Sequence, residues 1–266
     1  AQQYTLAVNW LPGGQLIAGQ RALGTYRFAI PWGTKPDEYS LRVVLYSIGS
    51  GRNLDVVESE QIKASIEIAS VIVERALHYP DTVVTENRAN ADFGHRVVLL
   101  GWDGNVKQLT TGGTFNIQFL WKSMAAPLEN LNASVSLENA NGSHQVGNAA
   151  LAKGYPTSLW RVGEIVRGHH AFIVPADLPD GDYALVLHVH EASKGSALSL
   201  YNGWLPRGDA FTLTRVRVVG HPHSYVIPTI ANPQPTNFGN CIALLGYALN
   251  ASKLRAGDSL QPTVYW

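Results

Sequence analysis

The chain repeats itself at a spacing of about 145 residues. The segment 93–102, Phe-Gly-His-Arg-Val-Val-Leu-Leu-Gly-Trp, resembles the segment 238–247, Phe-Gly-Asn-Cys-Ile-Ala-Leu-Leu-Gly-Tyr. The register holds without a gap as far as Trp121, which is matched by Trp266. A fixed period defines the folding unit, and this one has the length of a whole domain. The sequence therefore predicts tandem copies of one module.

A second pair of segments repeats at nearly the same spacing. Tyr-Arg-Phe-Ala-Ile-Pro at 26–31 resembles His-Ala-Phe-Ile-Val-Pro at 170–175, and Tyr39 is matched by Tyr183. One module is therefore complete and another is divided. We expect the later strands of a split module at 1–74, a linker at 75–89, the complete module at 90–220, a proline-rich linker at 221–236, and the first two strands of a split module at 237–266.

The pattern within the module is that of β-structure. Short runs rich in branched and aromatic residues alternate with clusters of Gly, Pro, Asn and Asp, and no segment keeps a helical period. About six to eight such strands per module predict an all-β chain of tandem β-sandwiches, immunoglobulin-like or jelly-roll-like. The strands expected in the complete module are 96–102, 114–121, 133–137, 170–174, 183–190 and 211–219.

Three motifs carry a resemblance to a known group of proteins. They are Leu-Leu-Gly-Trp at 99–102, Gly-Tyr-Pro-Thr-Ser-Leu-Trp-Arg-Val-Gly-Glu at 154–164, and Pro-Ala-Asp-Leu-Pro-Asp-Gly-Asp-Tyr at 175–183. Together they resemble the β-sandwich repeats near the C-termini of large bacterial envelope proteins, including membrane glycosyltransferases of the dolichyl-phosphate-mannose type. The resemblance implies a fold and an extracellular or cell-envelope location, and it assigns no catalytic residue. The segment 154–164 has no counterpart in the first copy, so a site built on it would occur once per chain.

Charge and hydropathy make several kinds of partner unexpected. Twenty Lys and Arg balance twenty Asp and Glu, so no basic field would hold a nucleic acid. No apolar run reaches the length of a membrane helix, and the first residues lack the pattern of a signal peptide. We expect no nucleic-acid partner and no membrane insertion of this segment. Asn132, Asn141 and Asn250 begin Asn-x-Ser triplets, whose glycosylation stays open.

The sequence contains little that points to catalysis. It has no nucleophile elbow, no phosphate-binding glycine loop and no His-Glu-x-x-His motif, so we predict no enzyme, no cofactor and no metal. A pair of carboxylates brought together only by the fold, as in a glycosidase, stays open. His188 and His190 share a strand face, yet the first copy has Val44 and Tyr46 in their places. Cys241 is the single cysteine and is expected to be a small strand residue.

Tryptophan raises the question of carbohydrate binding. Trp121 and Trp266 occupy equivalent positions and are expected to pack in the core or at a junction. Trp160 and Trp204 lie in loop-like, Gly- and Pro-rich stretches of the complete module alone. They are the candidates for stacking on a sugar ring.

Two functions remain at this point. The first is a non-catalytic structural subunit of the bacterial cell surface, in which copies of the chain join head to tail by strand complementation, with a filament as one outcome. The second is a carbohydrate-binding accessory region of an envelope glycosyltransferase-like protein, with cell-surface polysaccharide as partner. Whether the split module closes within one chain or between chains is open. The residues expected to form the donated core are Ile242, Leu244, Leu249, Leu254, Leu260, Val264 and Trp266.

Overall fold

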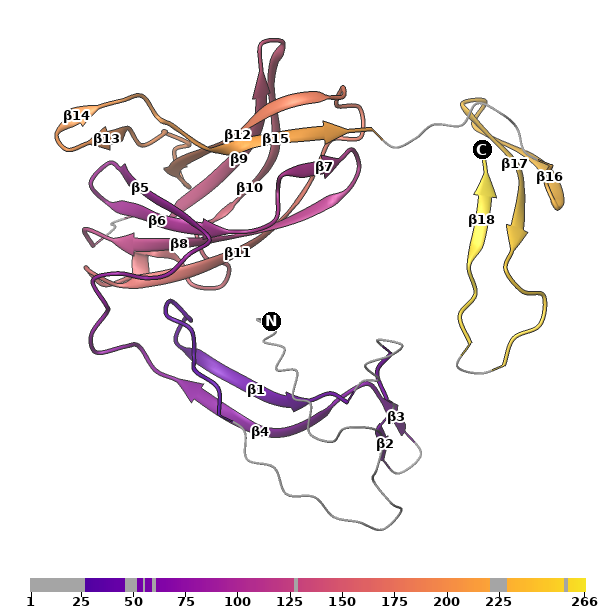
Figure 1. Ribbon diagram of the computed structural model, residues 1–266, viewed down its shortest axis with the longest axis horizontal. Helices are drawn as coiled ribbons and strands as arrows, with labels where there is room; N and C mark the ends of the chain where they lie inside the picture. The colour runs from indigo at the N-terminus through magenta and orange to yellow at the C-terminus, as the bar shows by residue number, and fades with distance from the viewer. Residues whose placement is uncertain are drawn as a thin grey trace. The chain divides into compact units, whose positions relative to one another are not determined.

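The computed structural model describes residues 27–45, 52–54, 56–58, 61–126, 129–220, 229–255 and 258–266 (Figure 1). The chain divides into two compact units, Ala1–Val219 and Gly220–Trp266. In the described part of the chain every regular element is a strand, except for a single 3₁₀ turn at Thr157–Leu159. The predicted all-β class is confirmed, with sheets packed face to face in the first unit.

The complete module is a sandwich of two sheets. The five-stranded sheet has the order β10 (Gly142–Ala150), β9 (Leu131–Asn139), β12 (Gly181–Glu191), β15 (Ala210–Val219) and β7 (Gln108–Thr110). The six-stranded sheet has the order β11 (Ile165–Ile173), β8 (Thr114–Ser123), β6 (Val97–Asp103), β5 (Asn87–Phe93), β13 (Leu200–Asn202) and β14 (Leu205–Pro206). Neighbouring strands are antiparallel except β15 and β7, which run parallel.

The core lies between these sheets because side chains alternate between the two faces of each strand. Along β8, Phe115, Ile117, Phe119 and Trp121 are all buried, and the residues between the first three of them are polar. Phe93 adds a ring 6.2 Å from that of Trp121. The opposite sheet covers these rings with a second set of fully buried residues: Val135, Leu137, Leu185, Leu187 and Val189.

The N-terminal region contains a ribbon that copies part of this sandwich. Strand β1 (Asp37–Val43) pairs with β4 (Ile66–Val73), beside a short hairpin of β2 (Val56–Glu58) and β3 (Gln61–Lys63). The register shifts between Leu41 and Arg42, and the β12–β15 pair shifts at the equivalent step between Leu185 and Val186.

A tyrosine makes the same backbone contact in both pairs. The Tyr39 hydroxyl donates to the carbonyl of Lys35 at 3.0 Å, and the Tyr183 hydroxyl donates to that of Pro179 at 2.9 Å. The ribbon is therefore a second copy of the β12–β15 pair.

The C-terminal unit copies three strands of the six-stranded sheet. Its order is β16 (Asn232–Phe238), β17 (Ile242–Leu249) and β18 (Pro262–Tyr265), which corresponds to β5, β6 and β8. The turn between the first two strands places Gly94 and His95 at φ 64° and 53°, and Gly239 and Asn240 at φ 60° and 58°.

Irregularities and ring contacts also coincide between the two copies. The bulge between Arg88 and Ala91 recurs between Pro233 and Thr236, each pair being 145 positions apart. The rings of Phe238 and Trp266 lie 6.0 Å apart, as those of Phe93 and Trp121 do at 6.2 Å. The repeat read from the sequence is thus a repeat of backbone geometry.

Two element boundaries differ from the expected ones. Strand β5 begins at Asn87, within the stretch 75–89 expected to be a linker, and β16 begins at Asn232, within the proline-rich stretch 221–236. The C-terminal copy therefore has three strands where the sequence predicted two. Pro233 fits because it sits at the bulge of a strand with a neighbour on one side only, where a missing N–H is tolerated.

Candidate functional site

The C-terminal unit presents an apolar face that is core in the complete module. Six of the seven residues predicted to be donated have buried counterparts 145 positions earlier: Val97, Leu99, Leu109, Phe115, Phe119 and Trp121. In the C-terminal unit, Ile242 is 56% exposed and Trp266 is 65% exposed, against 0% for Val97 and Trp121. We call the surface formed by Ile242, Leu244, Leu254, Leu260, Val264 and Trp266 the uncovered face.

The seventh predicted residue, Leu249, has a different place. Its counterpart is Gly104, just after strand β6, and Leu249 is the last residue of β17. It is exposed, but the complete module has no core side chain at that position. Leu249 therefore does not belong to the uncovered face.

Sheet edges are open where the complete module has neighbours. In the sandwich, β8 pairs with both β6 and β11, and the stretch at Leu109 pairs with β15. Within the described C-terminal residues, β18 pairs with β17 alone, and Leu254 lies in no ladder. Such an edge is a template for pairing with another chain.

The N-terminal ribbon lacks the neighbours that its counterpart has in the complete module. Tyr39 and Leu41 are half-buried, whereas their counterparts Tyr183 and Leu185 are buried. In the sandwich, β12 pairs with β9 as well as with β15; among the described residues, β1 pairs with β4 alone. The ribbon and the C-terminal unit are thus copies of opposite halves of one sandwich.

The two tryptophans predicted to stack on sugars lie in contrasting environments. Trp160 is 3% exposed, and its indole N–H donates to the carbonyl of Tyr155 at 3.0 Å. It is part of the core, so the prediction that its ring is a stacking surface is corrected. Trp204 is 88% exposed at the turn between β13 and β14.

Trp204 belongs to a cluster of aromatic rings on the surface. The imidazole of His95 lies 5.5 Å from the Trp204 ring and 4.2 Å from the Tyr201 ring, measured between centroids. Asp92 holds His95 in place, because its carboxylate accepts the His95 backbone N–H at 2.9 Å and contacts Nδ1 at 2.7 Å. We call Trp204, Tyr201 and His95 the aromatic cluster. Sequence reasoning missed His95 and Tyr201, which are 106 positions apart.

The segment 154–164 is a structural anchor. Glu164 is buried, and its Oε1 accepts from the Tyr155 hydroxyl at 2.7 Å and lies 3.4 Å from Arg75 Nε, while Oε2 accepts from the Arg161 backbone N–H at 2.8 Å. Burial and the hydrogen bond to Glu164 raise the pKa of Tyr155 to about 12. Tyr155 therefore keeps its proton at neutral pH, and the Glu164 carboxylate is occupied by partners within the protein.

The described histidines are dispersed along the chain. No group of three or more His, Cys, Asp or Glu side chains in the described ranges has an arrangement that could hold a metal ion. His188 lies 3.9 Å from Glu138 and 3.8 Å from Asp209, which are ion-pair distances. His170 is buried and stacked on Phe172, and burial lowers the pKa of His170 to about 4.

Cys241 is exposed at the turn before β17, whereas a small apolar strand residue was expected. In the described part of the chain, no helix is long and apolar enough to cross a membrane.

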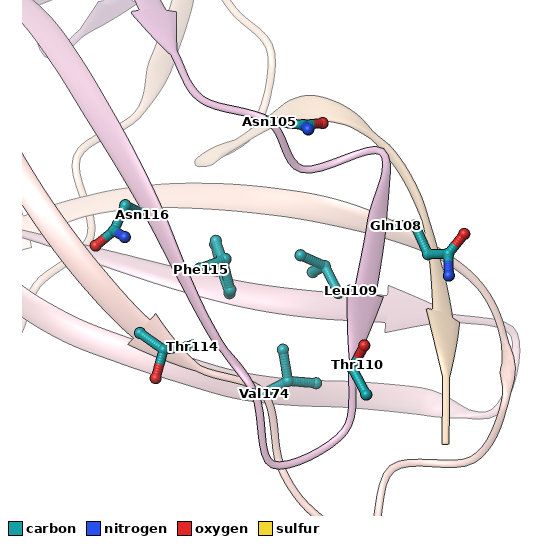
Figure 2. Close-up of a pocket in the computed structure, with 9 residues that line it drawn as sticks. Asn105, Gln108, Leu109, Thr110, Thr114, Phe115, Asn116 and Val174 are labelled. Atoms are coloured by element: carbon teal, nitrogen blue, oxygen red, sulfur yellow. The ribbon is translucent and has the colours of Figure 1, made fainter. Parts of the chain in front are cut away.

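A hollow of about 430 Å³ lies at one end of the sandwich, around the connection from β7 to β8 (Figure 2). Figure 2 shows Leu109, Phe115 and Val174 near its centre, with the amides of Gln108 and Asn116 toward its margin. None of its nine lining residues carries a carboxylate, imidazole, thiol or amine side chain. The hollow therefore offers no side chain suited to general acid–base catalysis.

Comparisons with known proteins give no family. No family model matches the chain, and no curated protein matches it. Among solved structures, the C-terminal domain of Wzt is similar at 9% identity and a TM-score of 0.35, over 56% of this chain and 87% of that one. The sporulation control protein Spo0M from Bacillus subtilis is similar at 14% identity and a TM-score of 0.22, over 50% of this chain and 51% of that one.

Proposed function

We propose that the chain is a non-catalytic structural subunit of the bacterial cell surface, in which copies join head to tail by completing each other's split module. One observation carries the proposal. The C-terminal unit reproduces strands β5, β6 and β8 down to the bulge and the turn, yet the face that is core in the sandwich is uncovered.

The complete module identifies what would cover that face. In the sandwich, the equivalent residues pack under β9 and β12 of the five-stranded sheet, and β15 pairs beside Leu109. The N-terminal ribbon is a copy of β12 and β15. The region that fits the uncovered face is therefore the N-terminal region of this chain, and we propose that another copy supplies it.

Apolar burial at this joint would be substantial. Covering the six side chains of the uncovered face contributes about 9 to 18 kcal/mol gross, at roughly 1.5 to 3 kcal/mol for each large side chain. The entropy of ordering the joined strands offsets part of this gain. Because the donating and receiving surfaces are different, the contact is heterologous, and one that does not close into a ring extends into a filament.

The absence of catalysis is part of the proposal. The buried carboxylate Glu164 is engaged on both oxygens, and Tyr155 is held protonated. The surface location rests on the resemblance of the 99–102, 154–164 and 175–183 motifs to extracytoplasmic repeats. A structural role needs none of these residues to meet a substrate.

A designed disulfide tests the joint. Gln118 of β8 lies opposite His169 of β11, and their equivalents are Thr263 and Thr25, the latter outside the described residues. In a Cys241→Ser background, the pair Thr25→Cys and Thr263→Cys should give a ladder of covalent oligomers on a non-reducing gel. Directly opposed residues of an antiparallel pair have a Cα separation within the range that a disulfide spans.

The control moves one thiol to a place where no contact is expected. Ser252 corresponds to Lys107, whose carbonyl bonds Arg217 of β15, so Ser252→Cys with Thr25→Cys should give no ladder. Free thiols in an unlinked monomer would contradict strand complementation. A monomer with an internal disulfide would contradict exchange between copies, because the module then closes within one chain.

A further inference from the structure

The aromatic cluster is held rigidly by two tight turns. Gly203 and Trp204 form a two-residue connection between β13 and β14, and Gly203 has φ 61°. A hairpin with left-handed glycine at its first central position matches the right-handed twist of its strands. The Trp204 ring is therefore presented by a defined turn at the edge of the six-stranded sheet.

The second turn supplies the histidine. Gly94 and His95 both have positive φ between β5 and β6, and Asp92 accepts the His95 backbone N–H at 2.9 Å. The copy of this turn in the C-terminal unit has Asn240 at the same φ, with its backbone N–H donating to Asn237 at 2.9 Å. Asparagine thus satisfies the turn, and the imidazole of His95 adds a ring that the turn itself does not need.

The cluster combines apolar faces with polar groups. Trp204 is 88% exposed, and Tyr201 is half-buried beside His95. Because His95 Nδ1 contacts the Asp92 carboxylate at 2.7 Å, Nε2 is the remaining polar atom of the imidazole. The indole face carries negative charge density, which attracts weakly positive C–H groups, and the indole N–H lies at its edge.

We propose that the aromatic cluster binds a neutral hexopyranose chain of gluco configuration. In such a sugar the hydroxyl groups are equatorial, so axial C–H groups form an apolar face that can lie on the indole of Trp204. The equatorial hydroxyls at the margin of that face then meet the imidazole of His95 and the carboxylate of Asp92. This site goes beyond the assembly function, since it lies on the complete module and shares no residue with the uncovered face.

Native gels that contain a soluble polysaccharide test the site with the full chain. The wild-type protein should be retarded by soluble β-glucan and less by mannan, whose axial 2-hydroxyl interrupts the apolar face. Trp204→Ala should weaken the affinity for β-glucan, read from the retardation at several polysaccharide concentrations, by about tenfold. This is the change expected for the loss of one stacking contact. Trp204→Phe keeps a ring and should fall between the two.

Two matched controls separate the ring from its surroundings. Leu205→Ala removes an exposed apolar side chain from the same hairpin and should behave as wild type. His95→Asn installs the residue that the C-terminal copy has at this turn, so it preserves the backbone and should weaken retardation. Circular dichroism of each variant confirms that the sandwich is folded.

Three outcomes would overturn the proposal. The first is no retardation of the wild type by either polysaccharide. The second is equal retardation of wild type and Trp204→Ala; if Trp204→Ala then also loses self-association, the cluster is a protein contact. The third is equal retardation by mannan and β-glucan, which would contradict the gluco configuration. The disulfide cross-linking of Thr25→Cys with Thr263→Cys tests strand complementation separately, so its result does not depend on whether the aromatic cluster binds polysaccharide.

Discussion

Three buried polar side chains of the complete module bear most directly on its stability. Glu164 and His170 both lie in the complete module, the first paired with Arg75 and the second stacked on Phe172. The indole N–H of Trp121 is buried and finds no acceptor among the described residues. Each of these groups was taken out of water on folding, so the stability of the module depends on how well each polar group is paired in the interior.

Replacement of Glu164 by Gln tests the buried anchor. Gln cannot accept on both oxygens, so Arg75 and either Tyr155 or the Arg161 N–H lose a partner. We expect Glu164→Gln to lower the free energy of unfolding by about 2 to 4 kcal/mol in urea titrations. Asp182→Asn, which breaks an exposed pair with Arg217, should cost less than about 1 kcal/mol. Equal losses would contradict the anchor.

His170 predicts a pH dependence of stability. Burial lowers the pKa of His170 to about 4, below the ordinary value of 6.5. Between these values the unfolded chain binds more protons, so the free energy of unfolding falls as pH drops from about 6.5 to about 4. The contribution is at most about 3.5 kcal/mol, since one pKa unit is worth about 1.4 kcal/mol.

His170→Phe should flatten that slope. Phenylalanine keeps a ring against Phe119 and Phe172 but does not titrate. The loss of the contact from His170 to the Leu151 carbonyl lowers stability at every pH and leaves the slope unaffected. Urea unfolding at several pH values measures both terms, and an unchanged slope in the variant would assign the pH dependence elsewhere.

At the scale of elements, the two copies of the repeat share a glycine beside the same bulge. Strand β6 and strand β17 each contain a glycine at the same place, Gly101 and Gly246. A Cβ on Gly101 would lie 2.6 Å from the Asn87 carbonyl oxygen, and one on Gly246 would lie 2.4 Å from that of Asn232. The close approach of the preceding strand at the bulge explains why both copies of the Leu-Leu-Gly motif carry glycine.

Gly101→Ala should therefore destabilise the sandwich. The new methyl group also clashes with the Thr85 side chain, so strand β5 must shift. We expect a loss of about 2 kcal/mol or more, in the range of overpacked core sites. Gly181→Ala is the control, since its Cβ would meet only Tyr183 at an ordinary 3.6 Å, and thermal melting should show little change. A mild effect of Gly101→Ala would mean that the strands are not so closely apposed.

The whole molecule is organised by which apolar faces are covered. The same side-chain pattern is buried in the complete module and uncovered in the C-terminal unit, as Val97 and Ile242 illustrate at 0% and 56% exposure. An uncovered core face beside an open strand edge favours association with whatever completes the sheet.

The same substitution at these two positions should affect different properties: folding of the sandwich at Val97, and self-association at Ile242. Val97→Asp places a charge in the core and should cost about 4 kcal/mol or more, enough to unfold the sandwich. Ile242→Asp should leave the melting of the sandwich nearly unchanged and reduce self-association, measured by light scattering over a range of concentrations. If Ile242→Asp associates like the wild type, the uncovered face is not the joint.

Local chemistry explains what could be predicted from the sequence. Alternation of apolar and polar residues, turn glycines and the 145-residue period are properties of neighbouring positions, so the all-β class and the tandem modules followed from them. Most of strand β16 lies in the stretch 221–236, whose prolines indicated an extended linker, and only the pairing with β17 shows where these prolines are tolerated.

Only the tertiary structure decided which of the two candidate tryptophans is buried and which is exposed. Trp160 and Trp204 lie in similar local sequence, but burial depends on strands far away in the chain, and these cover Trp160 and leave Trp204 exposed. His95 meets Tyr201 because β13 pairs with β5 across more than a hundred residues. A side chain's exposure is the sum of such distant contacts, and for that reason no local pattern could assign the site.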